Sequence, residues 1–425
     1  MTELPASGTR AATAPRGRGT GDASKARVYL LLEHVFGHGG VPRTSLNLAK
    51  QLADRGHEVE VISLVQRRDE SFFPVDERVR LTVLDDQRQE RGQRTHRLLH
   101  PRRARLEEQP SRLMPDRPDG EPGRAGGDEN LTRWTDLLLE RKLKGLAPGV
   151  VIATRPNLAA AVAQWAPEGV SRVTQEHISF RGRSSWARKA LRSVAADLDA
   201  LLTLTEEDRE LWRMALGDTG TLVEAIPNAS PFEVGEPAPL ESKIVIAAGR
   251  LSNQKGFDRL VPAFAKVAEK FPDWQLHIYG TGPDKRKLRR AIREADVGEN
   301  VILKGLVPGL EEEFRNASIY AMSSRYEGLP MVLLEAMSQG LPIVSFDCPE
   351  GPRQLITDDV NGLLVKEGDV DALAEALLRL IEEPSERRRM GLAGLERAHN
   401  YTADAVVTRW EELFARLGHG GVTAR

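Results

Sequence analysis

The sequence predicts an α/β protein of two domains, each built around a parallel β-sheet. The chain has 425 residues, which is roughly three times the length of a typical domain. Short apolar segments alternate with amphipathic ones along most of it, a pattern typical of β-α-β units and of the parallel sheet that they form. Four Pro or Gly residues fall within 230–241 and indicate a linker between the two domains.

The N-terminal domain is expected to span 27–229. Residues 1–26 before it are rich in Ala, Gly, Thr and Arg, and this composition predicts a disordered tail. Apolar runs predict seven strands, at 28–32, 59–64, 79–84, 150–153, 172–175, 200–204 and 222–226. Amphipathic stretches predict helices between them, at 44–54, 157–165, 185–196 and 206–216.

Residues 85–130 interrupt this alternation. They contain ten Arg and ten acidic residues, and within 88–105 seven Arg accompany a single Glu. A loop this long inside a compact domain is either functional or disordered. We interpret it as a solvated, Arg-rich insertion, and the alternative is a basic surface that contacts an anionic polymer or a membrane.

The C-terminal domain is expected to span 242–400, and its alternation is more regular. Its predicted strands are 244–248, 275–279, 301–304, 319–322 and 343–346. Its predicted helices are 257–270, 284–295, 309–316, 331–339 and 370–383, and a last helix follows at 401–418. Ligands bind such sheets at the carboxyl ends of the strands, so two facing sheets would place a deep cleft between the domains.

Composition excludes several classes of protein. Lys and Arg number 60 against 62 Asp and Glu, so no overall charge favours a nucleic-acid partner. A single cysteine, Cys348, excludes a disulfide scaffold and a Cys-rich metal site. We find no apolar run of about 18 residues and no apolar core of a secretion signal in the first 26 residues. We therefore expect a soluble, cytoplasmic protein that binds no nucleic acid.

The loop at 249–256 is a candidate phosphate site. It follows a predicted strand and precedes a predicted helix, where free backbone amides and the helix dipole favour an anion. Arg250 would add a forked donor and Lys255 a point charge, which together suit a diphosphate. The alternative from spacing alone is two solvated cations in a surface loop.

The helix that begins near Pro330 predicts a second anion site. Proline fits the first helical position, where its missing N–H is not needed. The amides of Gly328 to Val332 would then point at an anion ahead of the helix.

Two glutamates accompany this helix. Glu327 lies in the preceding loop and Glu335 inside the helix, on the order of 10 Å apart along its axis. Carboxylates that hydrolyse a glycosidic bond face each other at about 5 to 9.5 Å across that bond. This pair is better placed to accept hydrogen bonds from the hydroxyls of an elongated ligand, and a solvated helix face is the alternative for Glu335.

Two further positions are candidates on the N-terminal side. His177 follows a predicted strand at the edge expected to face the cleft, although a lone histidine is more often structural. Gly39 and Gly40 form a turn before the first predicted helix that would admit a phosphate, although glycine there also allows tight packing.

Together these segments resemble the family 4 retaining glycosyltransferases of the GT-B fold. The resemblance is carried by GRLSNQKGFD at 249–258, GTGP at 280–283, SSRYEGLPMVLLEAM at 323–337, GLPIV at 340–344 and NGLLV at 361–365. The first half matches more loosely, through Gly39-Gly40, His177 and Ile226-Pro227-Asn228. The segment FDCPEGPR at 346–353 is similar to members that decorate cell-wall or capsular polymers, including poly(glycerol-phosphate) glucosyltransferases.

The resemblance implies a role for each candidate side chain. Arg250 and Lys255 would bind the donor diphosphate and neutralise it as it leaves. Glu327 would lie beside the hydroxyls of the donor sugar, and Glu335 would hold the nucleotide ribose. His177 would form a hydrogen bond near the reacting sugar.

Backbone groups would complete the implied donor site. Gly39 and Gly40 would let the N-terminal loop approach the phosphates. The sugar and phosphate would be lined by Gly328, Leu329, Pro330, Met331 and Val332. In this family the last helix, here 401–418, would cross back to the N-terminal domain.

The implied reaction moves a hexosyl group, with retention, from a nucleotide sugar such as a UDP-sugar to a hydroxyl. The acceptor would be a cell-envelope glycan, a lipid-linked glycan or a polymer phosphate, with peripheral contact at the inner face of the membrane. The family needs no metal, and we expect no metal and no cofactor here. The alternatives are a nucleotide-sugar epimerase or a phosphorylase on the same fold, or a non-enzymatic protein that binds a polyanion or membrane through 85–130.

Overall fold

The computed structural model describes residues 25–37, 39–88, 101–113, 131–307, 309–349 and 351–419. Most of the predicted tail and much of the Arg-rich insertion lie outside the described residues. Ala26, the last residue assigned to the tail, is 5% exposed and donates its N–H to Nδ1 of His57. Ala26 therefore belongs to the core of the N-terminal domain and not to the predicted tail.

The N-terminal domain has a seven-stranded parallel sheet in the order β3-β2-β1-β4-β5-β6-β7. The strands are β1 (Arg27–Leu32), β2 (Glu58–Gln66), β3 (Arg80–Asp86), β4 (Gly149–Ala153), β5 (Val170–Gln175), β6 (Ala200–Thr203) and β7 (Leu222–Ala225). The helices are α1 (Gly40–Asp54), α3 (Pro101–Glu107), α4 (Arg133–Lys144), α5 (Pro156–Trp165), α6 (Ser185–Val194), η2 (Ala195–Asp197) and α7 (Glu206–Leu216).

Alternating side chains of these strands enter two different cores. Val28 and Leu30 belong to the core beneath α1, whereas Tyr29 and Leu31 belong to the core beneath α4, α5, α6 and α7. Successive strand residues point to opposite faces, so near-continuous apolar runs predict a sheet that is covered on both sides.

The C-terminal domain has a six-stranded parallel sheet in the order β10-β9-β8-β11-β12-β13. The strands are β8 (Ile244–Ala248), β9 (Gln275–Tyr279), β10 (Val301–Gly305), β11 (Ile319–Met322), β12 (Ile343–Asp347) and β13 (Gly362–Lys366). The helices are η3 (Asn253–Lys255), α8 (Phe257–Lys270), α9 (Lys285–Glu294), α10 (Glu311–Arg315), α11 (Met331–Ser338), α12 (Pro352–Leu355), α13 (Val370–Glu382) and α14 (Pro384–Ala398). These two sheets confirm the predicted pair of Rossmann-like domains.

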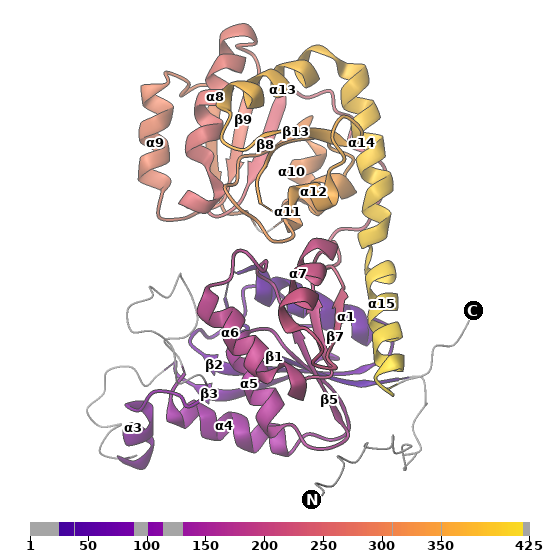
Figure 1. Cartoon of the computed structure of the whole chain (residues 1–425). Coiled ribbons are helices and arrows are strands. Elements are labelled where there is room, and N and C mark those ends of the chain that lie inside the picture. The colour runs from indigo at the N-terminus through magenta and orange to yellow at the C-terminus, as the bar shows by residue number, and fades with distance from the viewer. Residues whose placement is uncertain are drawn as a thin grey trace, which may run out of the picture.

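The last two helices join the domains along one side of the molecule (Figure 1). Helix α14 packs on α11 of the C-terminal domain, and η4 (His399–Tyr401) leads into α15 (Ala403–Arg416). Trp410 and Phe414 of α15 are 1% exposed and belong to the same core as α1. Helix α15 thus returns the chain from the C-terminal domain to the core of the N-terminal domain.

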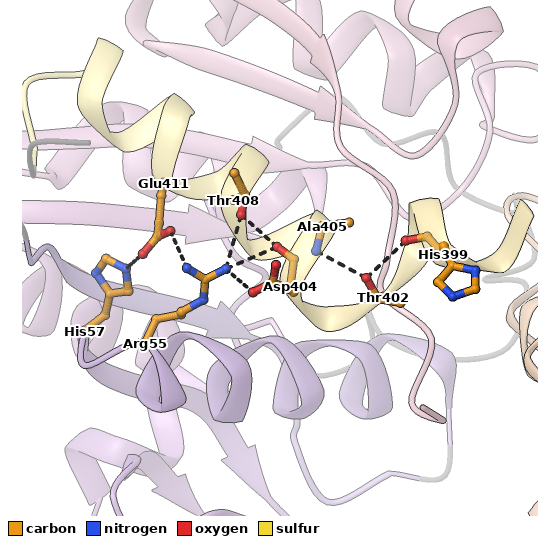
Figure 2. Close-up of polar contacts among 8 residues, drawn as sticks. All are labelled: Arg55, His57, His399, Thr402, Asp404, Ala405, Thr408 and Glu411. Carbon is orange, nitrogen blue, oxygen red and sulfur yellow. Dashed lines mark hydrogen bonds and ion pairs between the residues drawn. The ribbon is translucent and has the colours of Figure 1, made fainter. Parts of the chain in front are cut away.

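Polar contacts fix α15 to the end of α1 and the start of β2 (Figure 2). Arg55 contacts Asp404 at 2.5 Å, and its other terminal nitrogen contacts Glu411 at 3.4 Å. Nε2 of His57 lies 3.1 Å from Glu411. Because Nδ1 of His57 accepts the N–H of Ala26, Nε2 carries the proton and donates to Glu411.

The described part of the insertion differs from the prediction, which placed no regular structure in 85–130. Residues 101–107 form helix α3, which packs on α4. Arg103 of α3 contacts Asp85 at 2.9 Å and lies over the ring of Trp134, with its guanidinium carbon 5.3 Å from the ring centroid. An arginine that pairs with a buried carboxylate and stacks on an indole attaches this helix to the domain.

Other elements also differ from the prediction. Helix α1 begins at Gly40, four residues before the predicted start. Strand β13 and helix α14 were not predicted, although both close the C-terminal domain. Within the predicted linker, Ala238 and Leu240 are buried in a core shared with α11.

None of the helices within the described residues is long and apolar enough to cross a membrane.

Candidate active site

The loop after β8 holds Lys255 at the carboxyl end of the C-terminal sheet. Gly256 separates η3 from α8 and has φ +63°, and a Cβ there would lie 2.1 Å from the carbonyl oxygen of Ser323. Glycine alone combines that left-handed backbone with so close an approach. The side chain of Ser323 donates to the carbonyl of Lys255 at 3.0 Å. These contacts bring Lys255 against the loop that follows β11.

Lys255 forms an ion pair with Glu327. Its Nζ lies 2.6 Å from Oε1 of Glu327, which also accepts a 2.6 Å hydrogen bond from Ser324. Glu327 is 8% exposed. The carboxylate is thereby fixed by two donors on one oxygen.

Arg325 fastens the same two loops together. Its guanidinium contacts both carboxylate oxygens of Asp258 at 2.9 Å, a bidentate arrangement that fixes geometry as well as charge. The backbone N–H of Arg325 donates to the carbonyl of Gln254. The side-chain amide of Gln254 in turn donates to the carbonyl of Tyr326. The motifs 249–258 and 323–337 therefore form one structural unit.

Helix α11 begins at Met331, with Pro330 as its N-cap. The prediction that every amide from Gly328 to Val332 faces an anion needs one correction, because Pro330 has no N–H. The donors in this stretch are the amides of Gly328, Leu329, Met331 and Val332. The helix dipole adds a partial positive charge at the same place.

Glu335 lies one turn into α11 and is 1% exposed. Its Oε1 lies 2.7 Å from a guanidinium nitrogen of Arg43, which belongs to α1 of the other domain. Its Oε2 is buried and has no hydrogen-bond partner among the described residues. Burial raises the pKa of Glu335, while the charges of Arg43 and Lys255 lower it.

His177 follows β5 and faces the C-terminal domain. Its carbonyl oxygen lies 3.3 Å from where a Cβ on Gly328 would stand, so the two domains are in contact here. Burial, together with the nearby charges of Arg183 and Arg155, lowers the pKa of His177 to about 3. Its imidazole is therefore neutral, and its buried Nε2 has no partner among the described residues.

The remaining predicted positions, Gly39, Gly40 and Arg250, lie at different places relative to Lys255 and Glu335. Gly39 is the N-cap of α1 and Gly40 its first residue, one turn before Arg43. A Cβ on Gly40 would meet nothing within 4 Å, so the backbone there is open to a ligand. Arg250 is exposed at the start of the loop, and within the described part of the chain no hydrogen bond or ion pair joins its guanidinium to Lys255 or Glu327.

Arg43 is the residue of this group that sequence reasoning missed. It lies 292 residues before Glu335, and no motif links the two positions. The available signal was weak: Arg43 comes three residues after the Gly39-Gly40 turn, on the first turn of α1. Among the described residues, no group of three or more His, Cys, Asp or Glu is arranged to hold a metal ion.

The fold and the site together define a class of protein. Two parallel-sheet domains meet at the carboxyl ends of their strands, where a lysine, two buried carboxylates, a neutral histidine and a helix N-terminus gather. This arrangement suits an anionic ligand that carries hydroxyl groups. Family models agree: the glycosyl transferase 4-like domain matches residues 39–229, and glycosyl transferases group 1 matches 232–397. The chain belongs to the glycosyltransferases of the GT-B fold, as its motifs predicted.

Two curated relatives are similar to large parts of the chain. The exopolysaccharide phosphotransferase of Streptomyces coelicolor is 34% identical over 382 residues, which are 89% of this chain and 39% of that protein. The poly(glycerol-phosphate) alpha-glucosyltransferase of Bacillus subtilis is 27% identical over 221 residues, which are 50% of this chain and 32% of that protein. The chain therefore spans only about a third to two fifths of the length of these relatives.

A solved structure shows the same fold over almost the whole chain. A mutant of S. aureus TarM, in complex with Fondaparinux, alpha-GlcNAc-glycerol and UDP, superimposes with a TM-score of 0.71. The two sequences are 15% identical, and the superposition covers 92% of this chain and 99% of the TarM chain. The likeness extends to both domains.

Proposed function

We propose that the chain transfers a hexosyl group, with retention of configuration, from a UDP-sugar to a hydroxyl of a cell-envelope glycan or polymer. The observation that carries the proposal is the Lys255–Glu327 pair, 2.6 Å apart at the N-terminus of α11. It combines a cation for a diphosphate with a carboxylate for sugar hydroxyls. The UDP in the TarM complex and the name of the Bacillus relative support the donor and the polymer acceptor.

In the proposed reaction, the acceptor oxygen forms a bond to the anomeric carbon while the bond from that carbon to the donor phosphate oxygen breaks. The acceptor proton passes to the departing phosphate oxygen, on the face from which the nucleotide leaves. Lys255, Arg250 and the amides of α11 stabilise the charge that develops on the diphosphate. Glu327 holds a sugar hydroxyl, and neutral His177 offers a hydrogen bond without a competing charge.

The proposed mechanism is metal-independent. Charge on a departing diphosphate is stabilised either by a bound cation or by fixed protein donors. Lys255 and the N-terminus of α11 already supply fixed positive charge at this place. We propose that they replace the metal, and activity in excess EDTA tests that step.

The Streptomyces relative motivates a second candidate activity, because its name describes a phosphotransferase. A sugar-phosphate transfer breaks the bond between the two phosphates of the donor and releases UMP, whereas a glycosyl transfer releases UDP. More than half of that relative lies outside the match. The nucleotide product therefore distinguishes the two activities in a single assay.

The test incubates the protein with UDP-glucose or UDP-N-acetylglucosamine, a poly(glycerol phosphate) acceptor and excess EDTA, and follows nucleotide and product by chromatography. We expect UDP and a glycosylated polymer. Lys255→Ala and Glu327→Gln should each lower turnover at least 100-fold, since removing one fixed charge partner of a transition state costs about that factor. Lys266→Ala is the matched control, because Lys266 is an exposed lysine on α8.

Four outcomes would contradict parts of the proposal. Release of UMP would indicate phosphotransfer, and conversion of the donor without an acceptor would indicate an epimerase. Unchanged turnover in Lys255→Ala would overturn the donor-site assignment. Strict dependence on Mn²⁺ or Mg²⁺ would overturn the metal-free mechanism.

A further inference from the structure

The ion pair between Arg43 and Glu335 joins the two domains at the candidate donor site. The two atoms are 2.7 Å apart, and the side chains are 34% and 1% exposed. The pair is therefore asymmetric: the carboxylate, on α11 of the C-terminal domain, is buried, and its half-buried cation comes from α1 of the N-terminal domain. Any separation of the domains would leave Glu335 without Arg43.

The position of Arg43 is fixed from its own domain. It lies in the first turn of α1, where its N–H donates to the carbonyl of Gly39. Its guanidinium carbon is 5.9 Å from the ring centroid of Phe73, within the range of a cation–π contact. A ring on one side and a carboxylate on the other hold the guanidinium at the interface.

The second oxygen of Glu335 lacks a partner. Oε2 is buried and accepts no hydrogen bond from the described residues, and such an orphaned acceptor is unfavourable unless a ligand satisfies it. A nucleotide ribose carries two adjacent hydroxyls, each of which can donate. Oε2 can accept a ribose hydroxyl while Oε1 stays on Arg43.

The charge of Glu335 depends on a small set of groups. Arg43 and Lys255 favour the ionised carboxylate, and burial opposes it. Tyr320 lies within electrostatic reach of both Glu327 and Glu335, and burial raises the pKa of its hydroxyl, so that it stays neutral. Arg43, which adds a hydrogen bond to its charge, favours the ionised carboxylate more than Lys255 does.

We propose that Arg43 is a positioning residue for the donor: from the opposite domain it keeps Glu335 ionised and directs Oε2 toward the ribose. The inference rests on the proposed function, since it needs Glu335 to receive a ribose. It extends that function by making the ribose site complete only when the domains are closed. Opening removes the hydrogen bond and the charge of Arg43 that orient this carboxylate, and its affinity for a hydroxyl donor falls.

The experiment measures UDP affinity by calorimetry between pH 5.5 and 8.5. In the wild-type protein, affinity should rise with pH as Glu335 ionises and then level off. Arg43→Gln should move this rise upward by about one pH unit or more, which is a tenfold loss of affinity in the affected range. Arg43→Lys keeps the charge and should restore much of the profile.

Three variants separate this role from a structural one. Glu335→Gln has no carboxylate to titrate at this position, so the part of the pH dependence of UDP affinity that comes from Glu335 should be absent. Adding Arg43→Gln to this variant should have little further effect. Lys50→Gln changes an exposed cation on the same helix and should leave the profile unchanged. Titration of the UDP phosphate is common to all variants and cancels in the comparison.

KM and kcat also distinguish a positioning role of Arg43 from a structural one. Arg43→Gln should raise KM for the UDP-sugar about tenfold near neutral pH and change kcat at saturating donor much less. A wild-type pH profile in Arg43→Gln, or an undiminished effect of Arg43→Gln in the Glu335→Gln background, would overturn the inference. Absence of UDP binding by the wild-type protein at every pH would instead overturn the proposed function.

Discussion

Gly256 determines where Lys255 lies. Its φ of +63° turns the chain from η3 into α8, and its missing Cβ allows the carbonyl of Ser323 to approach. Lys255 and the loop before α11 are brought together by this contact as much as by the ion pair itself. The position therefore tests whether the geometry of the loop, and not only its charges, matters for activity.

We expect Gly256→Ala to lose stability and activity together. A left-handed alanine costs about 1–2 kcal/mol, and the displaced carbonyl of Ser323 adds to that cost, for a total of roughly 2–4 kcal/mol. Donor turnover should fall at least tenfold because Lys255 moves with the loop. Gly220 also has positive φ, +78°, but a Cβ there meets nothing within 4 Å.

Gly220→Ala is therefore the matched control. Its free energy of unfolding should fall only by the backbone cost, about 1–2 kcal/mol, and its turnover should be unchanged. Chemical denaturation and the UDP-release assay measure the two quantities. Equal losses of stability in the two variants would show that the contact with Ser323 contributes nothing.

The candidate site was predictable from sequence only where its residues are local. Lys255 and Glu327 each lie in a segment whose strand, loop and helix are readable, so their meeting at the carboxyl edge of one sheet follows from topology. Arg43 lies in the other domain, and its contact depends on how the domains close, which no local pattern records. The neutral state of His177 is likewise a result of burial and of two arginines from other elements.

Helix α15 completes the core of a domain to which it is not adjacent in sequence. Val406, Trp410 and Phe414 pack into the same cluster as Leu52 of α1. The arginine and histidine contacts of Figure 2 lie at the rim of this apolar interface. Burial of the apolar face supplies most of the stabilisation, since exposed ion pairs contribute little.

We expect Trp410→Ala to lower the free energy of unfolding by about 3–5 kcal/mol, because it removes a fully buried aromatic side chain and leaves a cavity. Leu392→Ala on α14 is the control. Leu392 is 55% exposed, and its truncation should cost under about 0.5 kcal/mol. Urea denaturation followed by circular dichroism compares the two, and a similar loss in both would show that α15 is not part of the folded core.

Element by element, the sequence predicted the strands best and the irregular helices least. Most strands are buried on both faces and appear as apolar runs, and the predicted boundaries lie within a few residues of those observed, whereas β13 was missed. Helix α14 was missed because Gly391 and Gly394 lower its helical propensity. A Cβ at Gly391 would lie 2.2 Å from the carbonyl of Gly340, so glycine there serves close packing rather than a turn.

At the scale of the whole molecule, buried and half-buried histidines contribute to the response to acid. Burial lowers the pKa of His34, His57, His177, His277 and His419 in the folded protein. Below pH 6.5 the unfolded chain therefore binds more protons than the folded one, and stability falls as pH falls through that value. The raised pKa of Glu176 and Glu335 acts in the opposite direction, but on fewer groups.

We expect the thermal midpoint to decrease as pH is lowered from 7.5 to 5.5. His57→Gln should reduce the size of that decrease, since it removes one titrating group at the α1–α15 contact. Differential scanning fluorimetry across the range measures both slopes. A midpoint that rises toward pH 5.5, or an unchanged slope in His57→Gln, would contradict the expectation.

The return of the chain to its first domain also constrains the order in which the protein can fold during synthesis. The apolar face that α15 covers, which includes Leu52 and Ala49, has no cover until residues 403–416 have emerged from the ribosome. All of the C-terminal sheet is translated before that point. The C-terminal domain is thus able to fold first, whereas the N-terminal domain completes its core only when α15 has been synthesised. In the interval its uncovered apolar face is a target for chaperones.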